Sequence, residues 1–279
     1  MNQGILYIVA TPIGNLSDIS TRAIEVLGQA DLIAAEDTRH SAGLMQFYDI
    51  NTPMQAYHEH NEEHMTPRLI QRLQGGENIA LVSDAGTPLM SDPGYRLVRA
   101  AHESSIQVSP VPGACAAIAA LCACGLATDR FLFAGFPPHK SIARQRFFEE
   151  LVLQPATLVF YESSHRIVAS VSDMQGVFGG ERQVTMAREI SKTFETIHKC
   201  TLKVLPDWLQ GDKNQQKGEF VIILAGAVIQ GEEQMSELAS VLKVLLADLP
   251  LKQSAQMAAK ITGVKKNMAY RLALELTAK

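Results

Sequence analysis

The sequence contains only four cysteines among its 279 residues. Their spacing lacks the paired pattern of zinc-binding cysteines, so we do not expect a metal-stabilised fold. Three of them fall in an alanine-rich segment, where a reduced thiol packs like a small apolar side chain. The four are Cys115, Cys122, Cys124 and Cys200.

Long apolar runs are also missing. The most apolar stretch, Ala114–Leu126, is shorter than the ~20 residues that a membrane-spanning helix needs. The chain starts with Met1–Gly4, which has no basic segment ahead of an apolar core, and this argues against a secretion signal. We therefore expect a cytoplasmic protein that does not enter the membrane.

Apolar residues make up 47% of the chain, which allows 279 residues to form two domains with a core each. The most informative segment is Ile79–Gly94, in which an apolar strand runs into a loop of Gly, Pro, Ser, Thr and Asp. A helical pattern begins directly afterwards at Tyr95. In open α/β sheets, ligands bind to loops at the carboxyl ends of strands, so this loop is a candidate site.

The composition of this loop limits what it can bind. It contains Asp84 and Asp92 but no Lys or Arg, whereas phosphate groups need positive charge and free backbone N–H groups. It suits a ligand that carries hydroxyl groups and an ammonium or other cation, but no phosphate. A plain surface turn between strand and helix is the alternative.

Three more apolar segments lead into polar or Gly- and Pro-containing loops. The alternation of strands with helices predicts an α/β fold with a mainly parallel sheet, one edge of which is lined by polar loops. The expected elements are a strand at Leu6–Ala10 with the loop Thr11–Leu16 and a helix at Thr21–Leu27 stopped by Gly28, a strand at Ala30–Ala35 with the charged cluster Glu36–His40, and the segment Val108–Gly113 with a helix from Ala114 to about Ala123.

The rest of the chain predicts a second α/β unit and a helical tail. We expect domains at residues 1–127 and 128–228, and a tail at residues 235–279 that Gly263 divides in helix-turn-helix style. The second unit has expected strands at 131–134, 157–161, 184–187 and 220–225, helices at 143–153 and 166–177, a polar loop at 210–218 and a linker at 231–234.

Charge is distributed unevenly along the chain. Residues 250–279 contain six basic residues and one acid, a net charge of +5, while the whole chain carries −4, so residues 1–249 carry −9. A basic tail on an acidic body predicts contact with a polyanion. A solvated helix face is the alternative.

Six motifs in this order resemble those of the tetrapyrrole methylase superfamily, and within it the branch that methylates small-subunit ribosomal RNA. The resemblance runs from Leu6 to about Ala225, and the closing segment Gly263–Asn267 is also similar to that branch. The motifs are Thr11–Leu16, Ala34–Arg39, Ser83–Pro88, Pro112–Gly113, Phe160–Ser163 with His165–Arg166, and Ala187–Glu189.

The resemblance implies an S-adenosylmethionine-dependent enzyme that methylates a cytidine ribose 2′-hydroxyl of 16S rRNA in the decoding region of the small subunit. It also implies two α/β domains with the cofactor in the cleft between them, a homodimer, and no metal ion. The chain has no Gly-x-Gly-x-Gly motif near its N-terminus, so the Rossmann-type methyltransferase site is not supported.

The family pattern carries over to a set of expected cofactor-binding residues. Asp84 is the best polar candidate, because its carboxylate can accept hydrogen bonds from an ammonium or from ribose hydroxyls; capping the local turn is its alternative role. The expected set is Pro12, Asp84, Thr87, Pro88, Leu89, Cys115, Ala116, Tyr161 and Phe220.

Charged residues at three strand ends are the candidates for catalysis and RNA contact. Methyl transfer to a ribose hydroxyl needs alignment of the reactants and a base near the hydroxyl. We expect Asp37 or Glu189 to be that base, and an interdomain ion-pair network is the alternative. The other catalytic candidates are Arg39, Glu162, Arg188 and Lys192, and the expected RNA contacts are Arg166, Lys252, Lys260, Lys265, Lys266 and Arg271.

Other interpretations stay open. A sibling enzyme could methylate a corrinoid or porphyrin carbon or a diphthamide precursor, although those relatives typically lack the basic tail and have Gly-Asp-Pro in place of Ser83–Ala85. A DNA-binding regulator could use the Ser254–Leu276 segment. The histidines of His58–His64 lack the helical spacing of a zinc site, so we expect a hydrated loop and helix start there.

Overall fold

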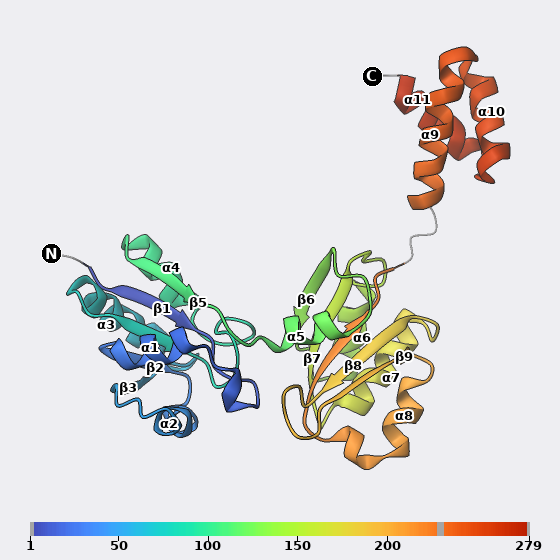
Figure 1. Ribbon diagram of the computed structural model, residues 1–279. Coiled ribbons are helices and arrows are strands. Elements are labelled where there is room, and N and C mark those ends of the chain that lie inside the picture. The colour runs from blue at the N-terminus through green and yellow to red at the C-terminus, as the bar shows by residue number, and fades with distance from the viewer. Residues whose placement is uncertain (1–2, 228–231, 278–279) are drawn as a thin grey trace. The chain divides into compact units, whose positions relative to one another are not determined.

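The computed structural model describes residues 3–227 and 232–277. The chain divides into two compact units, Met1–Gly226 and Ala227–Lys279 (Figure 1). The first unit contains two five-stranded sheets, and the second contains three helices. In the described residues no helix is both long and apolar enough to cross a membrane.

The first sheet is parallel throughout, as predicted. Its strand order is β3-β2-β4-β1-β5, so the sequence-distant strands β1 and β4 are neighbours at its centre. The carboxyl ends of these strands lie at one edge, and the predicted polar loops follow them. The strands are β1 (Ile5–Val9), β2 (Leu32–Ala35), β3 (Met54–Ala56), β4 (Ile79–Val82) and β5 (Gln107–Val111).

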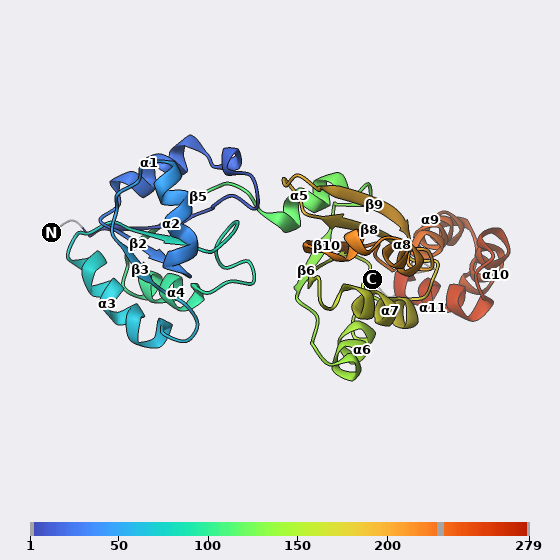
Figure 2. The ribbon, with the colours of Figure 1, turned by 90° about the horizontal axis from the view of Figure 1, so that it is seen from below.

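Helices cover both faces of this sheet (Figure 2). On one face, Leu27 of α1 and Met45 of α2 pack against the strands. On the other face, Leu69 of α3 and Leu97 of α4 do the same. The helices are α1 (Thr21–Gln29), α2 (Thr38–Phe47), α3 (Glu62–Gln74) and α4 (Tyr95–Glu103), and a short 3-10 helix, η1 (Leu16–Asp18), precedes α1.

The second sheet is mixed. Its order is β6-β7-β10-β8-β9, with β6 and β7 parallel and the other neighbours antiparallel. Because β7 and β8 are both antiparallel to β10, they run in the same direction and end at the same edge of the sheet. The strands are β6 (Phe131–Gly135), β7 (Thr157–Ser163), β8 (Gln183–Arg188), β9 (Thr196–Thr201) and β10 (Glu219–Leu224).

Helices also cover both faces of the second sheet. Phe148 and Val171 belong to the apolar cluster on one face, and Ala120 belongs to the cluster on the other face, where α5 packs. The division near residue 127 stays a prediction, but α5 packs on the second sheet. The helices are α5 (Ala116–Ala123), α6 (Ser141–Glu149), α7 (Ile167–Phe178) and α8 (Leu205–Gly211), followed by a 3-10 helix, η2 (Lys213–Gln216).

Several predicted boundaries were wrong. Helix α1 continues through Gly28 to Gln29, because the buried Leu27 anchors this turn and a helical glycine costs only about 1 kcal/mol. The expected loop at 210–218 includes the end of α8 and η2. The expected linker at 231–234 overlaps α9, which begins at Glu232. Gly231, the first residue of that expected linker, lies outside the described residues. Helix α2 and strands β3 and β9 were not predicted.

The second unit is a three-helix bundle. It consists of α9 (Glu232–Asp248), α10 (Leu251–Thr262) and α11 (Lys266–Thr277), which share an apolar core that includes Leu242 and Ala258. Gly263 ends α10 in the left-handed conformation, with a φ of 70° that favours glycine. The predicted division of the tail at Gly263 is therefore confirmed.

Candidate active site

Three loops at the edge of the first sheet are joined to one another. The backbone groups of Thr11 and Gly86 exchange two hydrogen bonds, of 2.9 and 3.1 Å, which tie the loop after β1 to the loop after β4. Thr87 Oγ1 donates to the carbonyl of Ala114 at 2.9 Å and so ties the β4 loop to the β5 loop. A Cβ atom at Gly113 would lie only 2.9 Å from Ala10 Cβ, so glycine is needed for the third junction.

A cavity of about 470 Å³ opens beside these loops. That volume lies in the range of small-molecule sites. Its walls come from the loops after β1, β2, β4 and β5 and from the ends of β7 and β10. The lining residues are Ile13, Glu36, Asp84, Ala85, Gly86, Thr87, Met90, Ser91, Asp92, Cys115, Ala116, Phe136, Tyr161, Glu162, Ser163, Ser164, Ile190, Gly218, Glu219, Phe220 and Val221.

The charged side chains that line this cavity are all acidic. Among the described residues that line it, none is Lys, Arg or His. Glu36, Asp84 and Asp92 line it, and none of the three has an ion-pair partner in the described part of the chain. Burial, together with the charges of Asp84 and Glu59, raises the pKa of Glu36. The cavity therefore favours a cation and disfavours a phosphate.

The pKa of Asp92 is well above its ordinary value. Burial raises the pKa of Asp92 to about 6, and the charges of Glu36 and Asp84 add to this, while a hydrogen bond from Ser83 opposes it. Asp84 is more exposed, and its Oδ1 accepts a hydrogen bond from the N–H of Asp37 at 3.1 Å.

Tyr161, on β7, forms part of the cavity wall that the second sheet contributes. Its hydroxyl oxygen accepts a hydrogen bond from the N–H of Ala117, in the first turn of α5, at 3.1 Å. Burial raises the pKa of Tyr161 to about 12, with contributions from Cys115 and Asp92, so the side chain stays neutral at physiological pH. Its ring packs edge-on against Phe133 and Phe136.

Six of the nine expected cofactor residues line the cavity, and three do not. Pro12 precedes the lining residue Ile13, and Pro88 is a buried residue within the β4 loop. Leu89 packs against Gly94, where a Cβ would lie 3.2 Å from Leu89 Cδ1. The six lining residues are Asp84, Thr87, Cys115, Ala116, Tyr161 and Phe220.

Asp37 and Arg39 lie outside the cavity lining. Asp37 caps α2 by accepting a hydrogen bond from the N–H of Arg39 at 2.8 Å, and its carboxylate also binds the Arg39 guanidinium. The side chain of Arg39 is 89% exposed. The Arg39 hydrogen bonds hold the pKa of Asp37 far below its usual range, which makes this carboxylate a weak proton acceptor.

Glu189 and Lys192 form an ion pair at the rim. Lys192 Nζ lies 3.0 Å from Glu189 Oε1 and 2.9 Å from Glu219 Oε2, and its stem crosses Gly14, where a Cβ would lie 2.3 Å from Lys192 Cγ. Burial raises the pKa of Glu189, but the hydrogen bonds from Lys192 and from the N–H of Glu219 outweigh it and lower that pKa overall. Of these residues only Glu219 lines the cavity.

Arg188 holds the neighbouring loops together. Its guanidinium donates to the carbonyls of Lys217 at 3.1 Å and Phe194 at 3.0 Å. The side chain is buried and does not line the cavity. These contacts indicate that Arg188 positions the loop Glu189–Glu195.

Glu162 and Arg166 form a second internal pair. Arg166 Nη2 lies 2.7 Å from Glu162 Oε1, and its Nη1 donates to the carbonyl of Pro137 at 3.0 Å. The side chain of Glu162 is fully buried and that of Arg166 is 15% exposed. Arg166 was expected to contact RNA, but its guanidinium is occupied by protein acceptors that include Ser163 Oγ.

Sequence reasoning missed part of the lining. Met90, Phe136 and Ile190 supply apolar surface, and Asp92 was noted only for its charge. The segment Ser83–Asp92 did contain a signal for Asp92, because a loop with two acidic residues and no Lys or Arg needs a positively charged partner. Phe136 had no comparable signal, because only the packing of β6 beside β7 brings it to the cavity.

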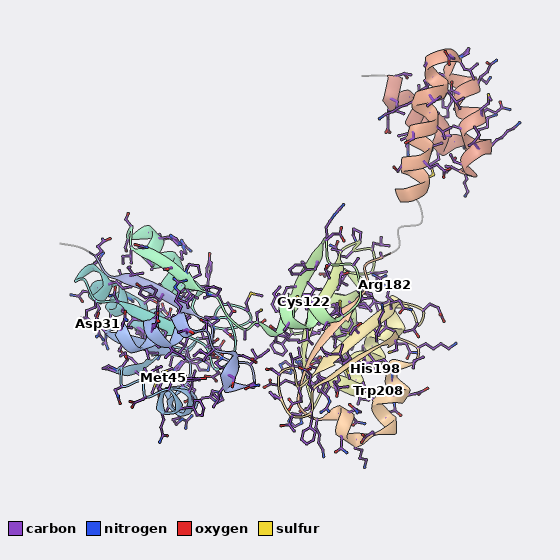
Figure 3. All side chains as sticks on the ribbon, viewed as in Figure 1. Asp31, Met45, Cys122, Arg182, His198 and Trp208 are labelled. Carbon is purple, nitrogen blue, oxygen red and sulfur yellow. The ribbon has the colours of Figure 1, made fainter. Side chains whose placement is uncertain are left out.

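None of the described residues that line the cavity is a histidine. In the described residues no group of three His, Cys, Asp or Glu side chains is placed to hold a metal ion. Helix α3 begins at Glu62, within the histidine-rich segment. The ring of His198, on β9, stacks on Trp208 with centroids 4.2 Å apart (Figure 3).

The expected RNA contacts of the tail are all exposed, and they lie on α10, on α11 and in the turn between them. No ion pair to any of them is found in residues 3–227 and 232–277. The five are Lys252, Lys260, Lys265, Lys266 and Arg271.

Comparison with known proteins relates both units to one group. The family model of tetrapyrrole (corrin/porphyrin) methylases matches residues 5–206, and that of the RsmI C-terminal HTH domain matches residues 232–277. Ribosomal RNA small subunit methyltransferase I of Pseudomonas aeruginosa is 55% identical over 99% of this chain and 98% of that protein. The protein of the same name from Escherichia coli O157:H7 is 52% identical over 98% of this chain and 96% of that protein.

A solved structure has the same fold at low identity. Uroporphyrin-III C-methyl transferase from Thermus thermophilus, complexed with S-adenyl homocysteine, has a TM-score of 0.55 and 15% identity. The match covers 81% of this chain and 99% of that chain. This likeness establishes the predicted two-sheet α/β architecture.

Proposed function

This chain belongs to the tetrapyrrole (corrin/porphyrin) methylase family, and we propose that it uses S-adenosylmethionine to methylate a cytidine ribose 2′-hydroxyl in 16S rRNA of the small-subunit decoding region. The observation that carries the proposal is the match to relatives named ribosomal RNA small subunit methyltransferase I, which extends through the tail. Sibling enzymes with tetrapyrrole substrates share the fold at much lower identity.

The chemistry of the cavity fits this cofactor. S-adenosylmethionine carries a sulfonium and an ammonium and has no phosphate. Glu36 and Asp84 supply negative charge without a competing cation, while Tyr161 and Phe220 supply apolar surface for the adenine. The neutral Tyr161 hydroxyl adds no further charge.

When bound, the cofactor supplies an activated methyl group for in-line displacement by the ribose oxygen. The three loops joined through Gly86, Thr87 and Ala114 form a fixed wall against which the two reactants can be aligned. Alignment of two reactants can supply about 7–11 kcal/mol of the barrier. The ion pair of Lys192 with Glu189 and Glu219 holds the opposite rim in place.

The tail is the proposed RNA-binding element. The five exposed cations on and between α10 and α11 can neutralise phosphates, which the acidic body does poorly. We also propose that the protein acts in the cytoplasm on rRNA or the small ribosomal subunit, and as a homodimer. A DNA-binding regulator would need the tail but would not need a cation-binding cavity.

The test is a map of ribose methylation on small-subunit rRNA by mass spectrometry, from cells with and without this gene. The expected result is the loss of one cytidine 2′-O-methyl group, restored by purified protein and S-adenosylmethionine on subunits from the deletion strain. An unchanged methylation map contradicts the proposal. Methyl transfer to a porphyrin or corrinoid in the same assay would favour the sibling activity.

A further inference from the structure

Phe136 is an exposed aromatic side chain at the cavity. It directly follows β6, the residue is 51% exposed, and it lines the cavity. Its ring meets Tyr161 edge-on, with the ring centroids 5.5 Å apart. About half of the residue's surface is therefore available to a ligand, although exposure of so large an apolar side chain gains nothing for folding.

The backbone after Phe136 is held by two arginines. Arg166 Nη1 donates to the carbonyl of Pro137 at 3.0 Å, and Arg144 Nη1 donates to that of His139 at 3.1 Å. Arg144 is itself buried and paired with Asp173. The loop thus presents the aromatic ring in a fixed position, which lowers the entropic cost of binding a ligand against it.

Asp92 lies across from this loop. A Cβ at Gly135 would be 3.5 Å from Ser91 Oγ, so the segments that carry Phe136 and Asp92 face each other. Asp92 also lines an adjoining polar hollow, together with Glu36 and Ser91. The residue is therefore reached both from the cofactor cavity and from a second opening.

The backbone beside Asp92 is strained. Leu89 has a φ of 71° and Ser91 a φ of 73°, in the left-handed region that residues other than glycine seldom adopt. Such strain is concentrated at functional sites. Two strained residues within three positions of Asp92 are independent evidence that the placement of its carboxylate matters.

We propose that the acceptor nucleoside binds between these two loops, with its base stacked on Phe136 and its ribose hydroxyl at the carboxylate of Asp92, which accepts the hydroxyl proton. The inference rests on the proposed function. A bond forms between the ribose oxygen and the methyl carbon of the methylsulfonium donor while the carbon–sulfur bond breaks, and its electron pair stays on sulfur. The proton passes to Asp92 and then to water.

Asp92 suits this role better than the neighbouring acids. Glu36 Oε2 accepts a hydrogen bond from the N–H of Asp84, and Asp84 accepts one from the N–H of Asp37, so both are engaged by backbone groups. A base works best with a pKa near the operating pH, and the pKa of Asp92 is raised to about 6. The titratable groups lining the two openings with it are Glu36, His58, Glu59, His60, Glu62, Asp84, Tyr95, Cys115, Tyr161, Glu162 and Glu219.

The test compares variants of the full-length protein in single-turnover methyl transfer to small ribosomal subunits. Asp92→Asn is paired with the control Asp129→Asn, whose carboxylate is 78% exposed. Phe136→Leu is paired with Phe47→Leu, because Phe47 is also exposed and packs edge-on against a tyrosine. Affinity for S-adenosylhomocysteine is measured by calorimetry for each variant.

We expect Asp92→Asn to slow methyl transfer by about 10²–10⁴-fold with product affinity within about twofold of wild type. The kcat/KM of wild type falls below pH about 6, whereas that of Asp92→Asn loses this inflection. Glu36→Gln keeps the inflection but moves it to lower pH, because a charge that raises the pKa of Asp92 is gone. Phe136→Leu weakens subunit binding by about 10–100-fold, and Phe136→Trp restores it.

Three outcomes overturn the inference. In the first, Asp92→Asn weakens S-adenosylhomocysteine binding and leaves the single-turnover rate intact, so Asp92 holds the cofactor. In the second, Asp37→Ala or Glu189→Ala abolishes transfer while Asp92→Asn does not. In the third, Phe136→Leu behaves like Phe47→Leu. If wild type itself transfers no methyl group to the subunit, the proposed function fails, which is a separate and recognisable result.

Discussion

The hydroxyl of Tyr161, at the carboxyl end of β7, accepts a hydrogen bond from the N–H of Ala117 in the first turn of α5. This N–H is one of the groups that a helix leaves without an internal partner. The contact fixes the first turn of α5, which carries the lining residue Ala116, against the second sheet. Tyr161→Phe should therefore lower the free energy of unfolding by about 0.5–1.5 kcal/mol.

This prediction is checked by urea denaturation, with Tyr48→Phe as a matched control outside the cavity. Tyr48 OH donates to the carbonyl of Leu16 at 2.6 Å, so both variants lose one hydrogen bond. Only Tyr161→Phe should also weaken S-adenosylhomocysteine binding. Equal cofactor affinity in the two variants would contradict a role for Tyr161 at the site.

Asp84→Asn should weaken S-adenosylmethionine binding by about 10–100-fold, because a hydrogen bond to a charged acceptor contributes about 1.5–3 kcal/mol. Calorimetry measures the change, and Asp129→Asn serves as the surface control. The wild-type protein should give no saturable heat with ATP, because the cavity lining contains acids and none of its described residues is a cation. Saturable ATP binding in place of S-adenosylmethionine binding would refute the assignment of the cofactor.

Gly218→Ala should destabilise the rim of the cavity. Gly218 has a φ of 96°, and a Cβ there would lie 2.5 Å from the carboxylate of Glu189. The substitution displaces the ion pair of Glu189 with Lys192, and we expect a loss of about 1–3 kcal/mol in the free energy of unfolding. Gly211→Ala is the control, because no atom lies within 4 Å of its Cβ position. It should be neutral or slightly stabilising, and equal melting temperatures for the two variants would contradict this account.

Replacement of Lys265, Lys266 and Arg271 by Gln should weaken rRNA binding and reduce its salt dependence. Each lost phosphate contact lowers the slope of log affinity against log salt by about one. Filter binding across salt concentrations measures the slope, with Lys203→Gln and Lys213→Gln on the first unit as controls. Cofactor affinity should not change. A lower melting temperature with an unchanged salt slope would assign these residues to packing of the tail.

Asp173→Asn should reduce stability in a pH-dependent way. Arg144 Nη2 lies 2.5 Å from Asp173 Oδ2, and both side chains are largely buried. Burial raises the pKa of Asp173, but hydrogen bonds from Gln145, Arg144 and Ser141 outweigh it and lower that pKa below 3.8. A group with a depressed pKa stabilises the fold above its unfolded pKa and loses this contribution as the pH falls through its folded pKa.

The variant should therefore lose about 3–5 kcal/mol at pH 7, because it leaves Arg144 buried without its partner. Between pH about 4 and the folded pKa of Asp173, wild type should lose stability as this carboxylate becomes protonated. The variant has no carboxylate there, so the difference in stability between the two proteins should shrink over this range. Urea denaturation at several pH values gives both results. A constant difference between the two proteins down to pH 2 would contradict the role given to this pair.

Much of the first sheet could be predicted from local pattern. The apolar runs that became β1 and β4 are short, continuous and followed by turn residues, which is typical of buried parallel strands. Gly263 was identified as a break between helices, and it has the positive φ that favours glycine. Strand β9 was missed, because its half-exposed Thr196–Thr201 segment mixes polar and apolar residues and is defined by pairing with β8.

The sequence by itself determined the charge of the loop after β4, since Asp84 and Asp92 without a Lys or Arg disfavour phosphate wherever the loop lies. Only the tertiary structure decided which charged residues reach the cavity. Glu189 and Arg166 are charged and lie near strand ends, as several cavity-lining residues do, but both side chains form ion pairs within the protein. The position of Phe136 beside Asp92 depends on the packing of segments more than 40 residues apart, which no local pattern encodes.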